Sequence, residues 1–200
     1  MPRLTWTAQE SWRDPRTGRV STRPRRVVQP ASGLNYRDAQ GQWQPTVAAF
    51  EVAEGALVTR RGPHQVRLPA SLAAVEGVEV VGPDQVRLRL APVGLGWFDP
   101  LTRRSVLLAE AQDAPAEMVA TNQVVYRDAF RGLKASVRFT YTRGGFSQHI
   151  ILEEALAPPG AYGLGDQSRL EVYTELLESS REPGMTSRVL RPANDPGAPA

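Results

Sequence analysis

Residues 133–142 read LKASVRFTYT and decide the fold class, because apolar and polar side chains alternate along them without a break. The apolar positions are Leu133, Ala135, Val137, Phe139 and Tyr141. A period of two is the pattern of a half-buried β-strand. The Gly144-Gly145 pair that follows predicts a two-residue type I′ turn, which requires positive φ at both of its positions.

The apolar pattern resumes after this turn at Phe146, Ile150 and Leu152. With Gly144-Gly145 as the loop, Phe139 is predicted to face Ile150, and Val137 to face Leu152. A slip of one residue would move one apolar set to the opposite side of the hairpin, so the pattern restricts the register. Residues 124–153 are therefore predicted to form the organising hairpin of the fold.

Turn sequences separate short apolar runs along the rest of the chain. Further hairpins are predicted around residues 38–41, 54–55, 82–84 and 99–102, with another strand over 64–68. A last strand is predicted over 170–176, with a short helix over 171–179 as the alternative. Strands with turn signals about every ten residues predict an all-β fold. We expect an antiparallel β-sandwich built from consecutive hairpins, with an open β-barrel as the alternative.

Composition divides the chain into three predicted parts. Residues 1–32 form a basic, Arg/Pro-rich lead-in with at most two short strands, around Trp12 and Val27-Val28. Residues 33–178 form the sandwich-like domain. Residues 179–200 form a Pro/Gly-rich tail or linker.

Composition also excludes several classes of function. A hydrophobic content of 41% supports a buried core, and the absence of cysteine removes disulfides, thiolate metal sites and cysteine nucleophiles. The net charge of +3 is too small to indicate a nucleic-acid partner. No apolar run approaches the roughly 20 residues of a membrane span, and the first residues lack the apolar segment of a signal peptide.

Catalytic motifs are missing from the sequence. It contains no phosphate-binding glycine loop, zinc-protease motif or nucleophile elbow. We therefore expect no enzyme activity, no cofactor and no metal site. A hydrolase using Glu171 and Glu175 is a remote alternative, which would require both carboxylates to line one cleft.

Aromatic residues at predicted hairpin ends are the better candidates for a functional role. An aromatic residue precedes an aspartate and a turn at several positions, and such an aspartate can accept a hydrogen bond from the backbone two residues on. Exposed rings there would stack on sugars or anchor a protein partner. The candidate contacts are Tyr36, Trp43, Trp97 and Tyr126. The alternative is that these rings fill the edges of the core.

Two blocks of sequence carry a resemblance to a known family. Residues 33–47, GLNYRDAQGQWQPTV, and residues 122–154, NQVVYRDAFRGLKASVRFTYTRGGFSQHIILEE, resemble the N-terminal β-rich regions of large bacterial Rhs/YD-repeat and related surface or secreted proteins. The resemblance implies a front-end β domain that acts as a plug, spacer or docking module. It transfers no catalytic residue, and no tandem YD repeats follow in this chain.

The resemblance and the aromatic pattern together predict a non-catalytic structural or interaction module of a larger protein, extracellular or at the cell surface. Its expected partner is another domain of the same polypeptide or a separate protein, with polysaccharide as a further possibility. The alternative is a carbohydrate-binding module, in which Trp43 and Trp97 would be exposed and coplanar.

Overall fold

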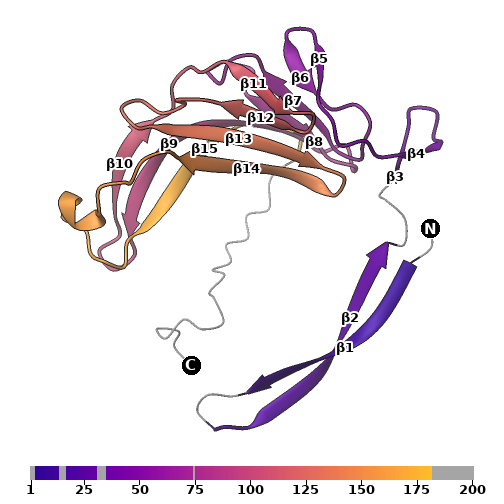
Figure 1. The fold of residues 1–200 in the computed structure, drawn as a ribbon, viewed down its shortest axis with the longest axis horizontal. Coiled ribbons are helices and arrows are strands. Elements are labelled where there is room, and N and C mark those ends of the chain that lie inside the picture. Colours follow the sequence, from indigo (N-terminus) through magenta and orange to yellow (C-terminus); the bar gives the residue numbers. More distant parts are fainter. Residues whose placement is uncertain (1–2, 14–16, 31–34, 74, 182–200) are drawn as a thin grey trace.

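A computed structural model describes residues 3–13, 17–30, 35–73 and 75–181, which form antiparallel strands and one short 3₁₀-helix (Figure 1). The first strands are β1 (Arg3–Arg13), β2 (Val20–Pro30), β3 (Asn35–Arg37), β4 (Trp43–Pro45), β5 (Glu51–Ala53), β6 (Ala56–Val58), β7 (Gln65–Pro69) and β8 (Val78–Val81). The later elements are β9 (Arg87–Asp99), β10 (Arg104–Glu110), β11 (Ala116–Ala120), β12 (Gln123–Tyr126), β13 (Ala135–Thr142), β14 (Gly145–Leu152), the 3₁₀-helix η1 (Pro159–Tyr162) and β15 (Arg169–Ser179). The all-β prediction is confirmed, and the helical alternative over 171–179 is wrong because β15 occupies those residues.

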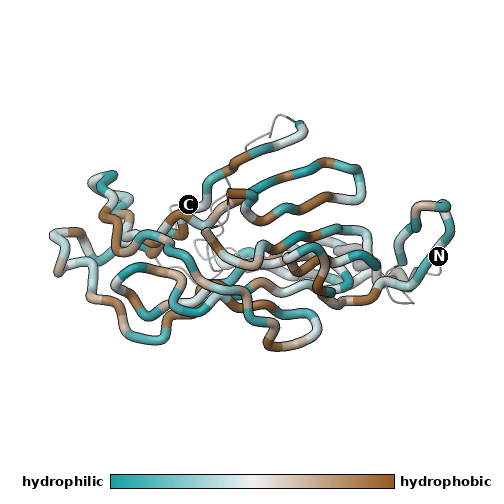
Figure 2. The backbone as a smooth tube through the Cα atoms, turned by 90° about the horizontal axis from the view of Figure 1, so that it is seen from above, coloured by the Kyte–Doolittle hydropathy of each residue, from teal (hydrophilic) through white to brown (hydrophobic). Residues whose placement is uncertain are grey.

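Two sheets make up the body of the molecule. The larger has seven strands in the order β10-β9-β8-β7-β6-β5, with β15 also paired to β9, and the smaller has the order β11-β12-β13-β14. Neither closes into a barrel, and their apolar faces form one core, which is the arrangement of a β-sandwich. Figure 2 shows hydrophobic and hydrophilic residues alternating along many of the strands, as this packing requires.

The core draws on both sheets and is centred on aromatic rings of the smaller one. Phe139 lies edge-on to Tyr126 at 5.9 Å between ring centroids and stacks on Phe146 at 5.4 Å. The larger sheet contributes buried aliphatic residues: Leu57, Val66, Leu68, Val78 and Leu95. The apolar residues of 133–142 thus face the core, as the alternation predicted, although β13 itself begins at Ala135.

The β13–β14 hairpin differs from its predicted register by two positions. Its turn residues are 143–144, and Gly145 is the first residue of β14. Val137 lies opposite Ile150, and Phe139 lies opposite Gln148. The predicted turn and the predicted Phe139–Ile150 and Val137–Leu152 pairs are therefore wrong. The core face was nevertheless correct, because a shift of two residues leaves every side chain on the same side of the sheet.

Strand β9 is one 13-residue strand where the sequence predicted two shorter ones. Strand β15 pairs with one edge of β9, along residues 88–98 of β9. On the other edge, β8 pairs with residues 87–90 of β9, and β10 pairs with residues 94–99. Pro92 and Gly94 lie at a register shift of β9 against β15. A β-bulge accommodates a residue without a backbone N–H, and this lets the strand continue through Pro92.

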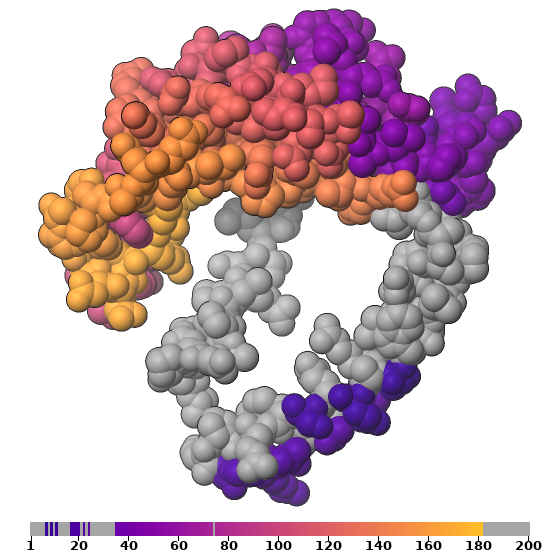
Figure 3. All heavy atoms as spheres, viewed as in Figure 1, coloured from indigo at the N-terminus to yellow at the C-terminus, as the bar shows by residue number. Residues whose placement is uncertain are grey.

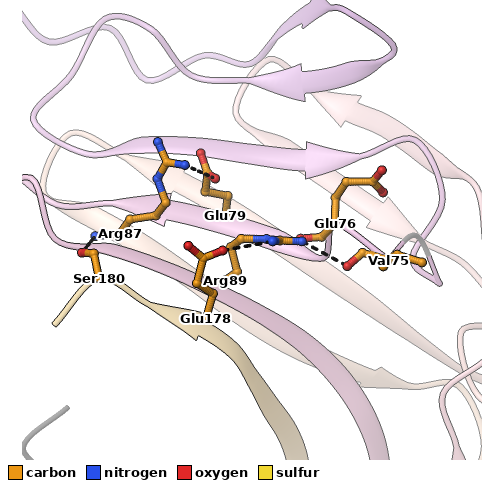
Figure 4. A network of polar contacts seen from close by, with 7 residues as sticks. All are labelled: Val75, Glu76, Glu79, Arg87, Arg89, Glu178 and Ser180. Atoms are coloured by element: carbon orange, nitrogen blue, oxygen red, sulfur yellow. Dashed lines mark hydrogen bonds and ion pairs between the residues drawn. The ribbon is translucent and has the colours of Figure 1, made fainter. Parts of the chain in front are cut away.

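Arg89 of β9 holds three segments together at this edge of the sandwich (Figure 4). Its guanidinium donates to the backbone oxygens of Glu76 at 2.8 Å and Val75 at 3.1 Å, and pairs with the Glu178 carboxylate at 3.0 Å. Nearby, the Ser180 hydroxyl accepts a hydrogen bond from the backbone N–H of Arg87. The loop before β8 and the end of β15 are thereby fixed to β9.

The N-terminal segment is more regular than predicted. Strands β1 and β2 pair antiparallel over eleven positions, from Arg3 opposite Pro30 to Arg13 opposite Val20, and form a sheet of their own. The expectation of at most two short strands there is wrong, because backbone pairing is continuous over all eleven residues of each strand. The division at residues 32 and 178 stays a prediction, and residues 182–200 of the predicted tail lie outside the described residues.

Gly62 gives a direct test of the packing between the two sheets. A Cβ at this position would overlap the hydroxyl of Tyr141, which donates to the backbone oxygen of His64 at 2.9 Å. We expect Gly62→Ala to lower the free energy of unfolding by about 1–3 kcal/mol, the usual cost of overpacking, in urea denaturation. Gly160→Ala is the control, since nothing lies within 4 Å of the added Cβ.

The overlap also predicts coupling between the two positions. In a Tyr141→Phe background the hydroxyl is gone, so Gly62→Ala should cost less than it does in the native chain. An equal cost in both backgrounds would show that this contact is not responsible.

Candidate functional site

A cleft of about 650 Å³ lies beside the β3–β4 hairpin and is called here the hairpin cleft. The hairpin forms one wall, and the loops at residues 60–65 and 82–85 form the other. Figure 3 shows the hairpin, in purple, projecting from one end of the sandwich. The lining residues are Asn35, Tyr36, Arg37, Asp38, Ala39, Gln40, Trp43, Arg60, Gly62, Pro63, Gln65, Gly82, Pro83 and Gln85.

The hairpin owes its shape to Asp38. One carboxylate oxygen accepts hydrogen bonds from the backbone N–H groups of Gln40 at 3.1 Å and Gln42 at 2.8 Å, and the other accepts one from the Gln44 side chain at 3.0 Å. The Gln44 amide, followed by these backbone donors, holds the pKa of Asp38 below its ordinary value. Gly41 closes a turn with a glycine bulge at φ +78°, so the hairpin predicted around residues 38–41 is confirmed.

Two of the four predicted aromatic contacts line this cleft. The side chain of Tyr36 is half-buried, whereas Trp43 is 57% exposed. Arg37 lies directly opposite Trp43 in the ladder, and its guanidinium carbon sits 5.0 Å from the centre of the indole ring. That cation–π contact covers part of the ring and holds the arginine at the cleft.

The other two predicted contacts lie elsewhere. Tyr126 is completely buried and donates to the backbone oxygen of Pro69 at 2.6 Å, so the prediction that it contacts a ligand is wrong. Burial raises the pKa of its hydroxyl and keeps it a donor. Trp97 is partly exposed and donates to the backbone oxygen of Ala157 at 3.2 Å. The β9–β10 and β3–β4 hairpins lie at opposite ends of the molecule (Figure 1), so Trp43 and Trp97 form no shared platform.

The far wall of the cleft brings residues that sequence reasoning missed. Arg60 follows β6, Gln65 begins β7, and Gln85 has φ +63° in the turn before β9. Nothing in the local sequence around these residues signals a site, because they meet only when the larger sheet forms. Within the part of the chain that the structure describes, neither Arg37 nor Arg60 has a carboxylate partner.

The wall is rigid because the core supports it from behind. The Tyr141 hydroxyl reaches the backbone of His64 from the smaller sheet, and burial raises the pKa of that hydroxyl so that it remains protonated. The buried Thr59 hydroxyl donates to the same backbone oxygen at 3.3 Å and accepts from the backbone N–H of Val66 at 2.8 Å. Residues 59–66 are thereby held in place, so this wall of the cleft is preformed.

Groups for metal or hydrolytic chemistry are not assembled at the cleft. No group of three or more His, Asp or Glu side chains suited to a metal ion exists among the described residues. Glu171 pairs with Arg169 at 3.1 Å, and neither it nor Glu175 lines the hairpin cleft. The arrangement offers aromatic faces, guanidinium groups and side-chain amides, which suit binding.

Comparison of the chain with protein-family models, curated proteins and solved structures gave no match. Within the described ranges, no helix has the length and hydropathy that crossing a membrane requires.

Asp38 makes the hairpin sensitive to acid. The pKa of Asp38 is lower in the folded hairpin than in the unfolded chain, so the ionised carboxylate stabilises the turn. This stabilisation is fully present above the ordinary aspartate pKa, and it is lost as pH falls through the lowered pKa. We expect the NMR chemical shift of the Asp38 carboxyl carbon to titrate at a pH below the ordinary aspartate pKa. The Gln42 amide proton should exchange with solvent faster once the carboxylate is protonated, because it donates to that carboxylate. Asp38→Asn should remove that transition. Titration of Asp38 at or above its ordinary pKa would contradict this account.

Proposed function

We propose that the chain is a non-catalytic interaction module of a larger bacterial surface or secreted protein, and that it docks a polypeptide segment in the hairpin cleft. The observation that carries the proposal is the meeting of Tyr36 and Trp43 with two arginines around one cavity of about 650 Å³. The resemblance to the N-terminal regions of Rhs/YD-repeat proteins supports a docking role. The segment would come from the same polypeptide or from a separate protein.

The composition of the cleft favours a polypeptide ligand. Tyr, Trp and Arg are the residues most enriched at binding hot spots. The cleft lining contains all three types, as Tyr36, Trp43, Arg37 and Arg60. The amides of Asn35, Gln65 and Gln85 each offer both donors and an acceptor, which match the N–H and C=O groups of an extended main chain.

The rigidity of the far wall supports tight binding. A wall fixed by Tyr141 and Thr59 loses little conformational entropy when a ligand enters. Trp43 is the natural anchor, because its exposed indole would lose solvent contact on binding and contributes large area for few rotatable bonds.

The proposal is tested by panning a random peptide library on the full chain and measuring the selected peptides by fluorescence anisotropy. We expect Trp43→Ala to weaken binding by about tenfold or more, the usual loss at a hot spot. Tyr162→Ala on η1 is the matched control, since this tyrosine is also exposed, at 38%, but lies outside the cleft.

Two results would contradict the proposal. Selected peptides that bind Trp43→Ala as tightly as the native chain would place docking elsewhere. Selection of no peptide, together with binding to a glycan array that Trp43→Ala abolishes, would favour the carbohydrate-binding alternative.

A further inference from the structure

We infer that the segment held in the hairpin cleft is acidic and that Arg37 and Arg60 bind its carboxylates. This inference rests on the proposed function and adds the chemical class of the ligand. Its basis is the charge of the cleft, which the described residues leave unbalanced.

Arg37 is held ready for an anion. Its guanidinium carbon lies 5.0 Å from the centre of the Trp43 ring. A guanidinium carries five N–H donors, and an aromatic ring does not satisfy them as a hydrogen-bond acceptor would. Within the described ranges, no protein acceptor meets them.

Arg60 stands opposite the hairpin with its charge also unpaired. Its chain neighbour Arg61 forms an ion pair with Glu51 at 3.2 Å and does not line the cleft. Arg60 lines the cleft and makes neither an ion pair nor a hydrogen bond among the described residues. Of these two neighbouring arginines, the cleft lining thus includes only the unpaired one.

The single carboxylate in the cleft lining cannot compensate. Asp38 already accepts three hydrogen bonds, from Gln40, Gln42 and Gln44, and these acceptor sites hold the turn together. The lining therefore carries two guanidinium groups against one engaged carboxylate, a net charge of +1. A ligand carboxylate would supply the missing acceptors, with forked N–H···O contacts that only a guanidinium provides.

The aromatic rings beside Arg37 narrow the class of ligand further. Because Trp43 and Tyr36 lie next to Arg37, an acidic residue bound there would place its neighbours against aromatic surface. The expected ligand is an acidic segment with apolar or proline residues between its carboxylates. A uniformly acidic chain would leave the rings uncovered.

The test uses a peptide array in which every Asp/Glu-containing sequence has a counterpart with Asn/Gln in the same positions. We expect the full chain to bind acidic members at least about tenfold more tightly than their amide counterparts. Arg37→Gln and Arg60→Gln should each reduce that preference severalfold, and Arg→Lys should restore only part of it, because lysine keeps the charge without the fork. Arg103→Gln is the matched control, an exposed arginine in the β9–β10 turn.

Salt gives an independent readout. Between about 0.1 M and 1 M salt the Debye length falls from about 10 Å to about 3 Å, so binding of acidic peptides should weaken and binding of amide counterparts should not. Peptides that bind equally in both forms, lose binding with Trp43→Ala and ignore Arg60→Gln would overturn the acidic ligand while leaving the docking cleft intact. No binding by any peptide would overturn the docking function itself.

Discussion

The pairing of β9 along both of its edges is the constraint on which the larger sheet depends. Strand β15 follows one edge, and β8 and β10 divide the other, so three strands align on one backbone. Gly94 and Gly96 permit this close packing. A Cβ at Gly94 would lie 2.7 Å from the backbone oxygen of Ala109, and a Cβ at Gly96 would lie 2.7 Å from the ring of Tyr173. After β10, backbone hydrogen bonds join residues 110–112 to residues 129–131, which lie between β12 and β13 of the smaller sheet. The end of β10 thus connects the two sheets.

The far wall of the hairpin cleft is positioned by a contact from the core of the sandwich. Tyr141 belongs to the smaller sheet, yet its hydroxyl reaches the loop that forms the far wall of the cleft, in the space that the missing side chain of Gly62 leaves open. A polar contact within the core thus positions a surface feature. The near wall depends instead on local chemistry, the hydrogen bonds to Asp38.

Sequence reasoning succeeded where structure is local and failed where it is not. The alternation over 133–142 and the turn at Asp38 follow from periodicity and from side-chain bonding to nearby backbone, and both were found. Alternation fixes which face a residue occupies but not its partner, so β14 was placed two positions out of register. Tyr126 shares the aromatic-x-aspartate pattern of Tyr36, and only the packing of the second sheet separates a core residue from a cleft residue. Arg60 belongs to the site through folding alone.

Among the residues that the structure describes, the strands of the β3–β4 hairpin pair with each other and with neither large sheet. One wall of the cleft can therefore accept new side chains, or a longer loop, without disturbing the hydrogen bonding of the sandwich. Substitutions at these few residues could therefore change binding with little effect on the stability of the fold. Related chains built on the same sandwich would then be free to diverge in ligand by exchanging this hairpin, with the Gly62–Tyr141 wall kept as a common support.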